Sequence, residues 1–450
     1  MIQDPLPIRP FSKSPEATVS VPGSKSLTNR ALLLAALCPG KTTLSGALFS
    51  RDTRIMLQAL QALGFAAEGD DAEARITVEG CGGSIPKAEA TLHVGNAGTA
   101  ARFLSAFVCL HPAGCYTFEA DEAMYRRPVA GLTDTLTEQG ATFEWLGEPG
   151  CFPFKVKTAG LKGGDMAVDA SASSQLLSAL LLVAPFTEAP ARVCLSGTTV
   201  SHPFVEMTVR LLGQFGVPVN PQESGVYGFE ADVRPGLSES EFAIEPDATA
   251  ASYFLALPLA VGGSIEVRGL KQEMLQGDIR FVDVLKKTGL KLEWTENGLR
   301  STFQDQAEPV DFDFNAVSDT FLTLAALTPL LRGPSTLKGI GHTRHQETDR
   351  IAAVATELLK MGQVVEETED SLTVDPSYPE LHLRSEAARA VGRPCRVKTY
   401  EDHRVAMSFA ILGCHNLMED GEPWLYIMDP GCCGKTFPNF FEVLESIHPQ

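Results

Sequence analysis

The sequence predicts an α/β protein made of two similar domains, each built from three repeated units of helices and short strands. Three observations support this fold class. A polar turn followed by a dense apolar run of helical length recurs six times, a second amphipathic run follows each copy, and short alternating segments separate them. The chain has 450 residues, which is enough for two or three domains with cores of their own.

The first run of each unit predicts a buried helix. Runs such as ALLLAAL, LLSALLLV and FLTLAALTPLL are apolar on every side, and a helix of that kind must be covered all round. The copies begin roughly 70–85 residues apart, a spacing that fits a βαβ-type unit with extra strands and not a simple solenoid repeat. The six copies begin at Pro22, Gly95, Asp169, Pro246, Val317 and Tyr400.

The second run of each unit predicts an outer helix, because it has one polar face. Proline near the first turn and glycine after the last turn are common helix boundaries. Segments such as ATFEWL and LKLEW follow these helices and predict strands. The predicted outer helices are Asp52–Leu63, Pro128–Gln139, Pro203–Phe215, Asp278–Thr288, Glu347–Met361 and a sixth from Pro438.

The boundary between the domains is expected near Ser238–Glu245, between the third and fourth units. The segment IRPFSKSPEATVSV lies before the first unit and has no neighbouring strand to pair with. We expect it to pair with the second half of the chain. This predicts one domain from residues 1–22 and 244–450 and another from 23–243, joined by two crossing segments that form a hinge beside a cleft.

Composition excludes several classes of partner. The formal net charge is −19, whereas nucleic-acid duplexes and anionic membranes attract basic surfaces. The N-terminal residues lack an apolar signal core, and the most apolar stretch, Leu176–Phe186, is too short to span a bilayer. The ten cysteines form no C-x-x-C pair, a pattern that suits a reducing compartment and not a zinc site. We therefore expect a cytoplasmic, monomeric protein that acts on small molecules.

Cations stand at the beginnings of the predicted helices, where the helix dipole disfavours them. Such positions, together with free backbone N–H groups and neighbouring Ser, Thr and Asn, make strong anion sites. Taken singly, each Ser or Thr here is more often an N-cap, and a lone Arg is more often a solvated surface residue. Repetition of the pattern in six turns favours binding of a phosphate ester and a carboxylate. The cations are Lys25, Arg30, Arg102, Arg126, Arg127, Arg344, Arg350, His403, Arg404 and Lys435.

Two carboxylates belong to the same pattern. Asp319 is expected at the N-cap of the fifth buried helix, and Glu347 at the start of the outer helix of that unit, beside Arg344 and Arg350. Each alone is more often a cap or a salt-bridge partner. Two carboxylates in different surroundings can also divide the roles of general acid and general base.

Six motifs in order resemble the 5-enolpyruvylshikimate-3-phosphate synthase family. They are PGSKSLTNRALLLAAL, GNAGTAARFL, ASSQLLSALLL, RHQETDRIAA, YEDHRVAMSFAI and GKTFPNFFEVL. The resemblance implies two inside-out α/β barrels whose parallel buried helices point their N-termini at the cleft. It also implies transfer of the enolpyruvyl group of phosphoenolpyruvate to the 5-hydroxyl of shikimate 3-phosphate by addition and elimination, in the shikimate pathway to chorismate and aromatic amino acids, without metal or cofactor.

The resemblance also implies roles for individual residues. Asp319 would take the proton of the 5-hydroxyl, and Glu347 would donate a proton to the methylene carbon and later remove one, with Lys25 as a further candidate for that duty. Shikimate 3-phosphate would be bound by Lys25, Ser26, Arg30, Ser173, Ser174, Gln175, Ser201, Asp319 and Gln346. Phosphoenolpyruvate would be bound by Lys25, Asn96, Gly98, Arg127, Gln175, Arg350, Arg404 and Lys435.

Four residues depart from the pattern of that family. Gln346 stands where Lys is usual and His342 where Asn is frequent, both beside shikimate 3-phosphate in the family. Phe204 replaces a Tyr near the 3-phosphate, which removes a hydroxyl donor. Phe103 stands where Pro is common, in the turn that shapes the phosphoenolpyruvate pocket, so sensitivity to the family's inhibitor glyphosate is left open.

Three other functions compete with this one. The related enolpyruvyl transferase that acts on UDP-N-acetylglucosamine is disfavoured by the Lys-Ser-x-x-Asn-Arg and Asp-His-Arg patterns. A P-loop phosphotransferase is suggested by GCCGKTF at 431–437, but Asp429 stands where the first glycine is required. A non-catalytic or RNA-end-processing protein with the same repeats is disfavoured by the acidic composition and the full set of site cations.

Overall fold

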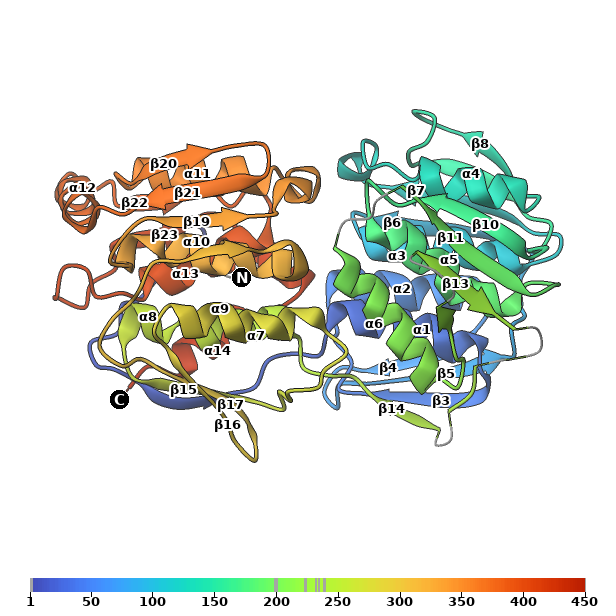
Figure 1. Ribbon diagram of the computed structural model, residues 1–450, viewed down its shortest axis with the longest axis horizontal. Coiled ribbons are helices and arrows are strands. Elements are labelled where there is room, and N and C mark those ends of the chain that lie inside the picture. Colours follow the sequence, from blue (N-terminus) through green and yellow to red (C-terminus); the bar gives the residue numbers. More distant parts are fainter. Residues whose placement is uncertain are drawn as a thin grey trace. The chain divides into compact units, whose positions relative to one another are not determined.

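The computed structural model describes residues 3–197, 201–221, 225–230, 233, 235–237 and 240–449. The chain forms two compact units, one from Met1–Pro22 with Pro246–Gln450 and the other from Gly23–Glu245. We call them the terminal unit and the central unit; Figure 1 shows the first in blue and in yellow to red, and the second in blue to green. Within the described ranges, no helix combines the length and the apolar character that crossing a membrane requires.

The central unit contains three four-stranded sheets with one pairing scheme. In each sheet the first two strands are parallel and the other pairs are antiparallel. The sheets, in spatial order, are β14 (Glu241–Ala243), β3 (Pro39–Ser45), β5 (Arg75–Cys81) and β4 (Ala66–Asp70); β6 (Glu89–Gly95), β7 (Cys115–Ala120), β9 (Phe154–Lys157) and β8 (Thr142–Trp145); and β10 (Gly164–Asp169), β11 (Ala191–Ser196), β13 (Val226–Phe229) and β12 (Asn220–Pro221).

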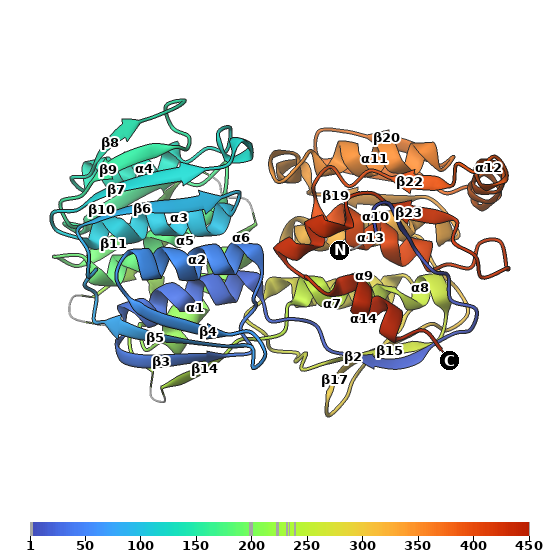
Figure 2. The ribbon, with the colours of Figure 1, turned by 180° about the vertical axis from the view of Figure 1, so that it is seen from behind.

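The terminal unit repeats this scheme in two four-stranded sheets and one three-stranded sheet. The sheets are β2 (Glu16–Val19), β15 (Ser264–Arg268), β17 (Gly298–Thr302) and β16 (Lys291–Trp294); β18 (Asp311–Asp313), β19 (Ser335–Lys338), β21 (Ser371–Asp375) and β20 (Val364–Glu367); and β22 (Cys395–Val397), β23 (Leu425–Ile427) and β1 (Leu6–Pro7). In Figures 1 and 2, β15 and β17 lie on one side of this unit and β20 and β21 on the opposite side, with α7, α10 and α13 between them.

The chain passes twice between the two units, and each time a strand pairs with a repeat that is distant in the sequence. β2 precedes the first buried helix in sequence but pairs in parallel with β15 of the fourth repeat. β14 precedes the fourth buried helix but pairs in parallel with β3 of the first repeat. The prediction that the segment before Pro22 pairs with the second half of the chain is confirmed.

Each unit has a core of three apolar helices that contact one another. Eleven of the thirteen α1 residues, Leu27 to Leu37, are buried, and burial of each leucine contributes about 1.5–3 kcal/mol. In the central unit Arg30, Phe103 and Ser178, each in the second turn of its helix, meet at the Arg30 side chain, so the second turns of the three core helices lie close together. The core helices are α1 (Lys25–Leu37), α3 (Gly98–Phe107) and α5 (Ser174–Val183), then α7 (Ala248–Ala256), α10 (Phe321–Leu327) and α13 (His403–Gly413).

The six outer helices also form, with boundaries within a few residues of the prediction. Five of them are followed by the predicted glycine, which adopts a positive φ angle from 78° at Gly216 to 113° at Gly140. The outer helices are α2 (Arg51–Ala62), α4 (Ala130–Glu138), α6 (His202–Gln214), α9 (Phe281–Lys287), α11 (Arg350–Lys360) and α14 (Phe440–Ser446).

The chain forms further helices. α12 (Tyr378–Ala390) lies outside the predicted repeats, whereas the short α8 (Pro258–Val261) directly follows α7 and belongs to the fourth apolar run. The 3₁₀ helices are η1 (Val108–Leu110), η2 (Glu122–Met124), η3 (Ala184–Phe186), η4 (Gly277–Arg280), η5 (Asn315–Thr320), η6 (Thr328–Leu330), η7 (Gly341–His345) and η8 (Pro430–Lys435).

Candidate active site

The terminal unit gathers charged side chains at the N-terminal ends of its buried helices. Arg404 is the second residue of α13, and its Nη2 lies 2.6 Å from Oδ2 of Asp319. The prediction that Asp319 caps the fifth buried helix is wrong. Asp319 lies in η5, α10 begins at Phe321, and the residue at its N-cap, Thr320, makes no capping hydrogen bond. The Asp319 carboxylate accepts from arginine side chains, and this brings two repeats together.

Arg350 is the centre of this cluster and is buried. Its guanidinium donates to Asp402 Oδ2 at 2.8 Å, Asp319 Oδ1 at 3.0 Å and Glu347 Oε2 at 2.9 Å, and it also contacts Gln346 Oε1. Burial lowers the pKa of Arg350, but the three carboxylates around it outweigh this effect and hold the pKa above its ordinary value.

Glu347 links Arg350 to a second cation. Its other carboxylate oxygen, Oε1, accepts from Lys435 Nζ at 2.8 Å, and Lys435 is the last residue of η8 and is buried. Glu347 was expected to begin the outer helix. It lies instead in the turn before α11, because Asp349 caps that helix by accepting from the backbone N–H of Ala352.

Arg344 does not join the cluster around Arg350 as its position beside Glu347 suggested. Its Nη1 donates to Asp349 Oδ2 at 2.7 Å, and its other donors bind the backbone carbonyls of Thr368 and Glu369. Arg344 therefore fastens the start of α11 to the loop between β20 and β21.

A further buried carboxyl, Asp278 of η4, lies beside the Asp319–Arg404 pair. Its Oδ2 accepts from the hydroxyl of Thr249 at 3.1 Å. Burial, together with the negative charges of Asp319 and Asp247, raises the pKa of Asp278 to about 7, against the attraction of Arg404.

In the central unit, Arg30 is buried in the core and not at a helix tip. It lies in the second turn of α1, and its side chain donates to Thr208 Oγ1 at 2.8 Å, Ser26 O at 2.9 Å, Phe204 O at 3.3 Å and Ser178 Oγ at 3.4 Å. All four partners are neutral. Burial lowers the pKa of Arg30 to about 9, so the group stays charged at neutral pH.

A second group of predicted residues meets at the beginnings of α3 and α5. Arg102 Nη1 donates to Gln175 Oε1 at 2.7 Å, Gln175 Nε2 donates to Thr99 Oγ1 at 3.2 Å, and Arg127 Nη1 donates to Asn96 Oδ1 at 3.2 Å. A Cβ atom on Gly98 would lie 3.1 Å from Nη1 of Arg102 and from Nη1 of Arg127. The absence of a side chain at Gly98 therefore lets two guanidinium groups approach one helix N-terminus.

The remaining predicted residues of this unit occupy helix starts. Lys25 is the first residue of α1, and its Nζ lies 3.5 Å from Asp52 Oδ2. Ser173 caps α5 by accepting from the backbone N–H of Gln175 at 3.3 Å. Ser26 is the second residue of α1, Ser174 is the first residue of α5, and Ser201 precedes α6 with a positive φ angle of 52°.

Comparison with known proteins identifies the family of the chain. The family model of EPSP synthase (3-phosphoshikimate 1-carboxyvinyltransferase) matches residues 12–444. A 3-phosphoshikimate 1-carboxyvinyltransferase from Opitutus terrae is 46% identical over 452 residues, covering 100% of this chain and 99% of the relative.

The chain belongs to the EPSP synthase family.

Another relative agrees with this assignment, and solved structures agree with the fold. A 3-phosphoshikimate 1-carboxyvinyltransferase from Nostoc punctiforme is 38% identical over 438 residues, covering 97% of this chain and 98% of the relative. An EPSP synthase structure from Acinetobacter baumannii has a TM-score of 0.80 at 22% identity, covering 99% and 98% of the two chains. The enolpyruvyl transferase NikO from Streptomyces tendae gives 0.72 at 14% identity, covering 99% and 97%. The fold predicted from the repeats and the resemblance predicted from the six motifs are confirmed.

The structure shows contacts for three of the four residues that depart from the EPSP synthase pattern. Gln346 contacts the Arg350 guanidinium through its Oε1. His342 Nε2 lies 2.9 Å from Ser318 Oγ, and burial lowers the pKa of this imidazole. Neither residue therefore supplies the positive charge that a lysine at position 346 would give. Phe103 packs its ring 4.9 Å beneath the Arg30 guanidinium, and nothing in the structure explains Phe204.

Two contributors to the site of this EPSP synthase family member were not predicted from the sequence. Asp402 binds Arg350 and also caps α13 by accepting from the backbone N–H of Arg404. Asp278 lies beside Asp319 and Arg404. Asp402 stands inside the Asp-His-Arg motif and could have been found there as an N-cap; the position of Asp278 depends on how η4 folds back on η5 and carried no comparable signal.

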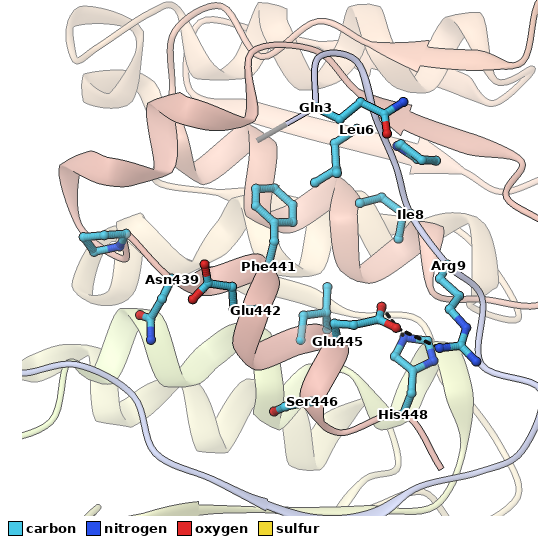
Figure 3. Close-up of a pocket in the computed structure, with 13 residues that line it drawn as sticks. Gln3, Leu6, Ile8, Arg9, Asn439, Phe441, Glu442, Glu445, Ser446 and His448 are labelled. Atoms are coloured by element: carbon cyan, nitrogen blue, oxygen red, sulfur yellow. Dashed lines mark hydrogen bonds and ion pairs between the residues drawn. The ribbon is translucent and has the colours of Figure 1, made fainter. Parts of the chain in front are cut away.

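A cavity of about 520 Å³ in the terminal unit lies between the N-terminal segment and α14. Figure 3 shows that Leu6, Ile8 and Phe441 line it together with polar and charged side chains, among them the Arg9–Glu445 ion pair. None of the site residues predicted for this EPSP synthase family member lines it.

Proposed function

We propose that this protein transfers the enolpyruvyl group of phosphoenolpyruvate to the 5-hydroxyl of shikimate 3-phosphate and that Asp319 and Glu347 move the protons. The full-length match to 3-phosphoshikimate 1-carboxyvinyltransferases supports the reaction. One observation supports the roles: each of these carboxylates is held by two cations of the terminal unit, and Arg350 is common to both.

The addition step converts the C2–C3 double bond into a single bond, forms a C2–O bond and a C3–H bond, and moves two protons. The 5-hydroxyl oxygen attacks C2 of phosphoenolpyruvate while Asp319 accepts the hydroxyl proton and Glu347 gives a proton to C3. The electron pair of the double bond forms the new C3–H bond, and C2 becomes tetrahedral with the phosphate still attached.

The elimination step reverses the change at C3. Glu347 removes a proton from the new methyl group, the C–H electron pair forms the double bond, and the C2–O bond to phosphate breaks. Phosphate leaves with the electron pair of the broken C2–O bond and takes up the proton that Asp319 accepted in the addition step, which returns both carboxyl groups to their starting states. No net redox change occurs in either step.

The cations bind the charged parts of phosphoenolpyruvate, which carries about 2.5–3 negative charges at neutral pH. We propose that Arg350, Arg404 and Lys435 bind it from the terminal unit. The central unit contributes Lys25, Asn96, Gly98, Arg127 and Gln175. An anionic ligand that takes these donors away from Asp319 and Glu347 leaves both carboxylates better proton acceptors, because each loses a stabilising cation.

We propose that shikimate 3-phosphate binds to Lys25, Ser26, Arg30, Ser173, Ser174, Gln175 and Ser201 of the central unit, with Asp319 and Gln346 of the terminal unit. The neutral surroundings of Arg30 support this assignment, since a buried guanidinium that hydrogen-bonds only to neutral groups gains from a nearby anion.

We propose that the protein acts as a monomer in the cytoplasm. All ten cysteines are free, as is usual in a reducing compartment. Sedimentation analysis and cell fractionation test these two statements; a stable dimer or a secreted pool would contradict them.

The acceptor test decides the function. Purified protein is mixed with phosphoenolpyruvate and either shikimate 3-phosphate or UDP-N-acetylglucosamine, without ATP, and phosphate release is measured. We expect release with shikimate 3-phosphate only. Release with UDP-N-acetylglucosamine only would show that the acceptor is wrong.

A further inference from the structure

Carboxyl groups and cations lie close together at the N-terminal ends of α7, α10 and α13. Arg350, Arg404 and Lys435 contact the carboxyl groups of Asp319, Glu347 and Asp402, and the buried Asp278 lies beside Asp319 and Arg404. An anion such as phosphoenolpyruvate bound to these cations would therefore lie close to several carboxyl groups. Its charge disfavours binding unless a proton neutralises one carboxyl.

Asp278 is the carboxyl whose contacts best suit it to hold that proton. Asp319 accepts from two arginines, Glu347 from Arg350 and Lys435, and Asp402 from Arg350. The one hydrogen bond that the structure gives to the Asp278 carboxyl comes from the neutral hydroxyl of Thr249, at 3.1 Å. The Asp278 side chain is also buried.

We propose that Asp278 is a positioning residue that takes up a proton when an anionic ligand binds Arg404, so that Asp319 stays ionised and can accept the hydroxyl proton. This inference rests on the function proposed above, because it takes phosphoenolpyruvate as the ligand of Arg404. Asp278 acts through Arg404 and Asp319, and nothing places it against the reacting atoms.

The groups around Asp278 set the direction of this linkage. η4 packs against η5, α7 and α9. From η5, Asp319 disfavours ionisation, and so does Asp247 at the start of α7; from α13, Arg404 favours it. An anion bound to Arg404 cancels the favourable contribution and leaves the two unfavourable ones, so the affinity of Asp278 for a proton rises.

Charged groups on the other neighbours of Asp278 do not offset this change. Asp283 and Lys286 of α9 are exposed and lie 3.4 Å from each other, and Arg280 of η4 itself is exposed. Because burial and nearby charge already raise the pKa of Asp278 to about 7, a small additional change is enough to protonate it near neutral pH.

The first experiment examines the free protein and does not depend on its function. Infrared difference spectra follow the carbonyl stretch of a protonated carboxylic acid between about pH 6 and pH 8.5. We expect a band that disappears with a midpoint near pH 7 and is absent in Asp278→Asn. In Thr249→Val, which removes the hydroxyl donor, the midpoint moves upward. The same band in Asp278→Asn would overturn the assignment.

The second experiment measures the linkage itself. Phosphoenolpyruvate is titrated calorimetrically at about pH 8, without shikimate 3-phosphate so that no chemistry occurs, in buffers of different ionisation enthalpy. We expect uptake of about 0.5–0.9 proton per ligand by the wild type, and a loss of most of that uptake in Asp278→Asn. Asp283→Asn, on exposed α9, is the control and keeps the wild-type value.

The outcomes separate the two proposals. Binding with the same proton uptake in wild type and Asp278→Asn overturns the role of Asp278 and leaves the proposed function intact. Failure of the wild type to bind phosphoenolpyruvate at all, together with no phosphate release in the acceptor test, overturns the proposed function and this linkage with it.

Discussion

Lys435 and Glu347 form an ion pair of 2.8 Å although 88 positions separate them in the sequence. The last repeat thus places a cation on a carboxylate of the fifth repeat. Arg404 does the same for Asp319 across 85 positions, at 2.6 Å. Arg404 lies in the first turn of α13 and Lys435 ends η8, and both side chains reach the neighbouring repeat, so the charged cluster is a product of the repeat architecture.

Replacement of Asp319 by Asn tests its role as the base. Asn keeps the size of the side chain but cannot accept the hydroxyl proton, so we expect kcat to fall by about 10²–10⁴-fold. Binding of shikimate 3-phosphate, measured by calorimetry, should change far less. Near-normal turnover by Asp319→Asn would show that another group takes the proton.

Replacement of Gly98 by Ala tests whether the beginning of α3 holds phosphoenolpyruvate. The added methyl group would lie 3.1 Å from guanidinium atoms of both Arg102 and Arg127, so these side chains must move. We expect KM for phosphoenolpyruvate to rise by about tenfold, equivalent to about 1.4 kcal/mol, with little change in KM for shikimate 3-phosphate.

Gly213 provides the matched control for Gly98. It lies in α6, and a Cβ atom there would meet no atom within 4 Å. Gly213→Ala should leave both KM values unchanged and slightly favour the helix. Equal effects of the two substitutions on phosphoenolpyruvate would argue against a ligand at Gly98.

Loss of Arg350 should destabilise the terminal unit. Arg350→Met leaves the buried Asp402 carboxylate without the donor that lies 2.8 Å away, and breaking a buried pair costs about 3–5 kcal/mol. Arg192→Met, which breaks an exposed pair with Asp165, should leave the free energy of unfolding almost unchanged. Urea unfolding measures both free energies; similar values would contradict the central place of Arg350 in the cluster.

Asp278 should make stability depend on pH in a defined direction. Its pKa is about 7 in the folded protein and about 3.9 in an unfolded chain. The folded state therefore binds the proton more tightly, and this contribution to stability is present at low pH and lost as the pH rises from about 4 to about 7. Asn does not titrate, so the stability of Asp278→Asn does not fall over this pH range through position 278.

We therefore expect the free energy of unfolding of Asp278→Asn, relative to wild type, to increase by up to about 3 kcal/mol between about pH 5 and about pH 8. Denaturant titrations at the two pH values measure this difference. Asp283→Asn should show no such change, and parallel pH profiles of wild type and Asp278→Asn would contradict the raised pKa.

The sequence was sufficient to predict the repeats and their helices, because both have local causes. The all-round apolar character of α1 and the glycine after α2 depend only on nearby residues. The pairing of β2 with β15 could also be predicted, since a strand before Pro22 had no nearby partner.

The side-chain partners within the site could not be predicted in the same way. Asp319 was expected to cap α10, but the chain forms η5 before that helix. Two arginines distant in sequence each bind one oxygen of the Asp319 carboxylate. Arg30 was expected at a helix tip, but a position five residues into α1 faces the core. Helical side chains lean toward the N-terminus, so Arg102 still reaches Gln175 from the second turn of α3.

Product analysis in D₂O tests the central claim most directly. Wild-type protein is incubated with phosphoenolpyruvate and shikimate 3-phosphate, and the products are followed by proton and phosphorus NMR. The addition–elimination route through Glu347 predicts one phosphate released for each enolpyruvyl ether formed, with deuterium in its methylene group. Absence of the ether, or an ether formed without any deuterium, would contradict the account.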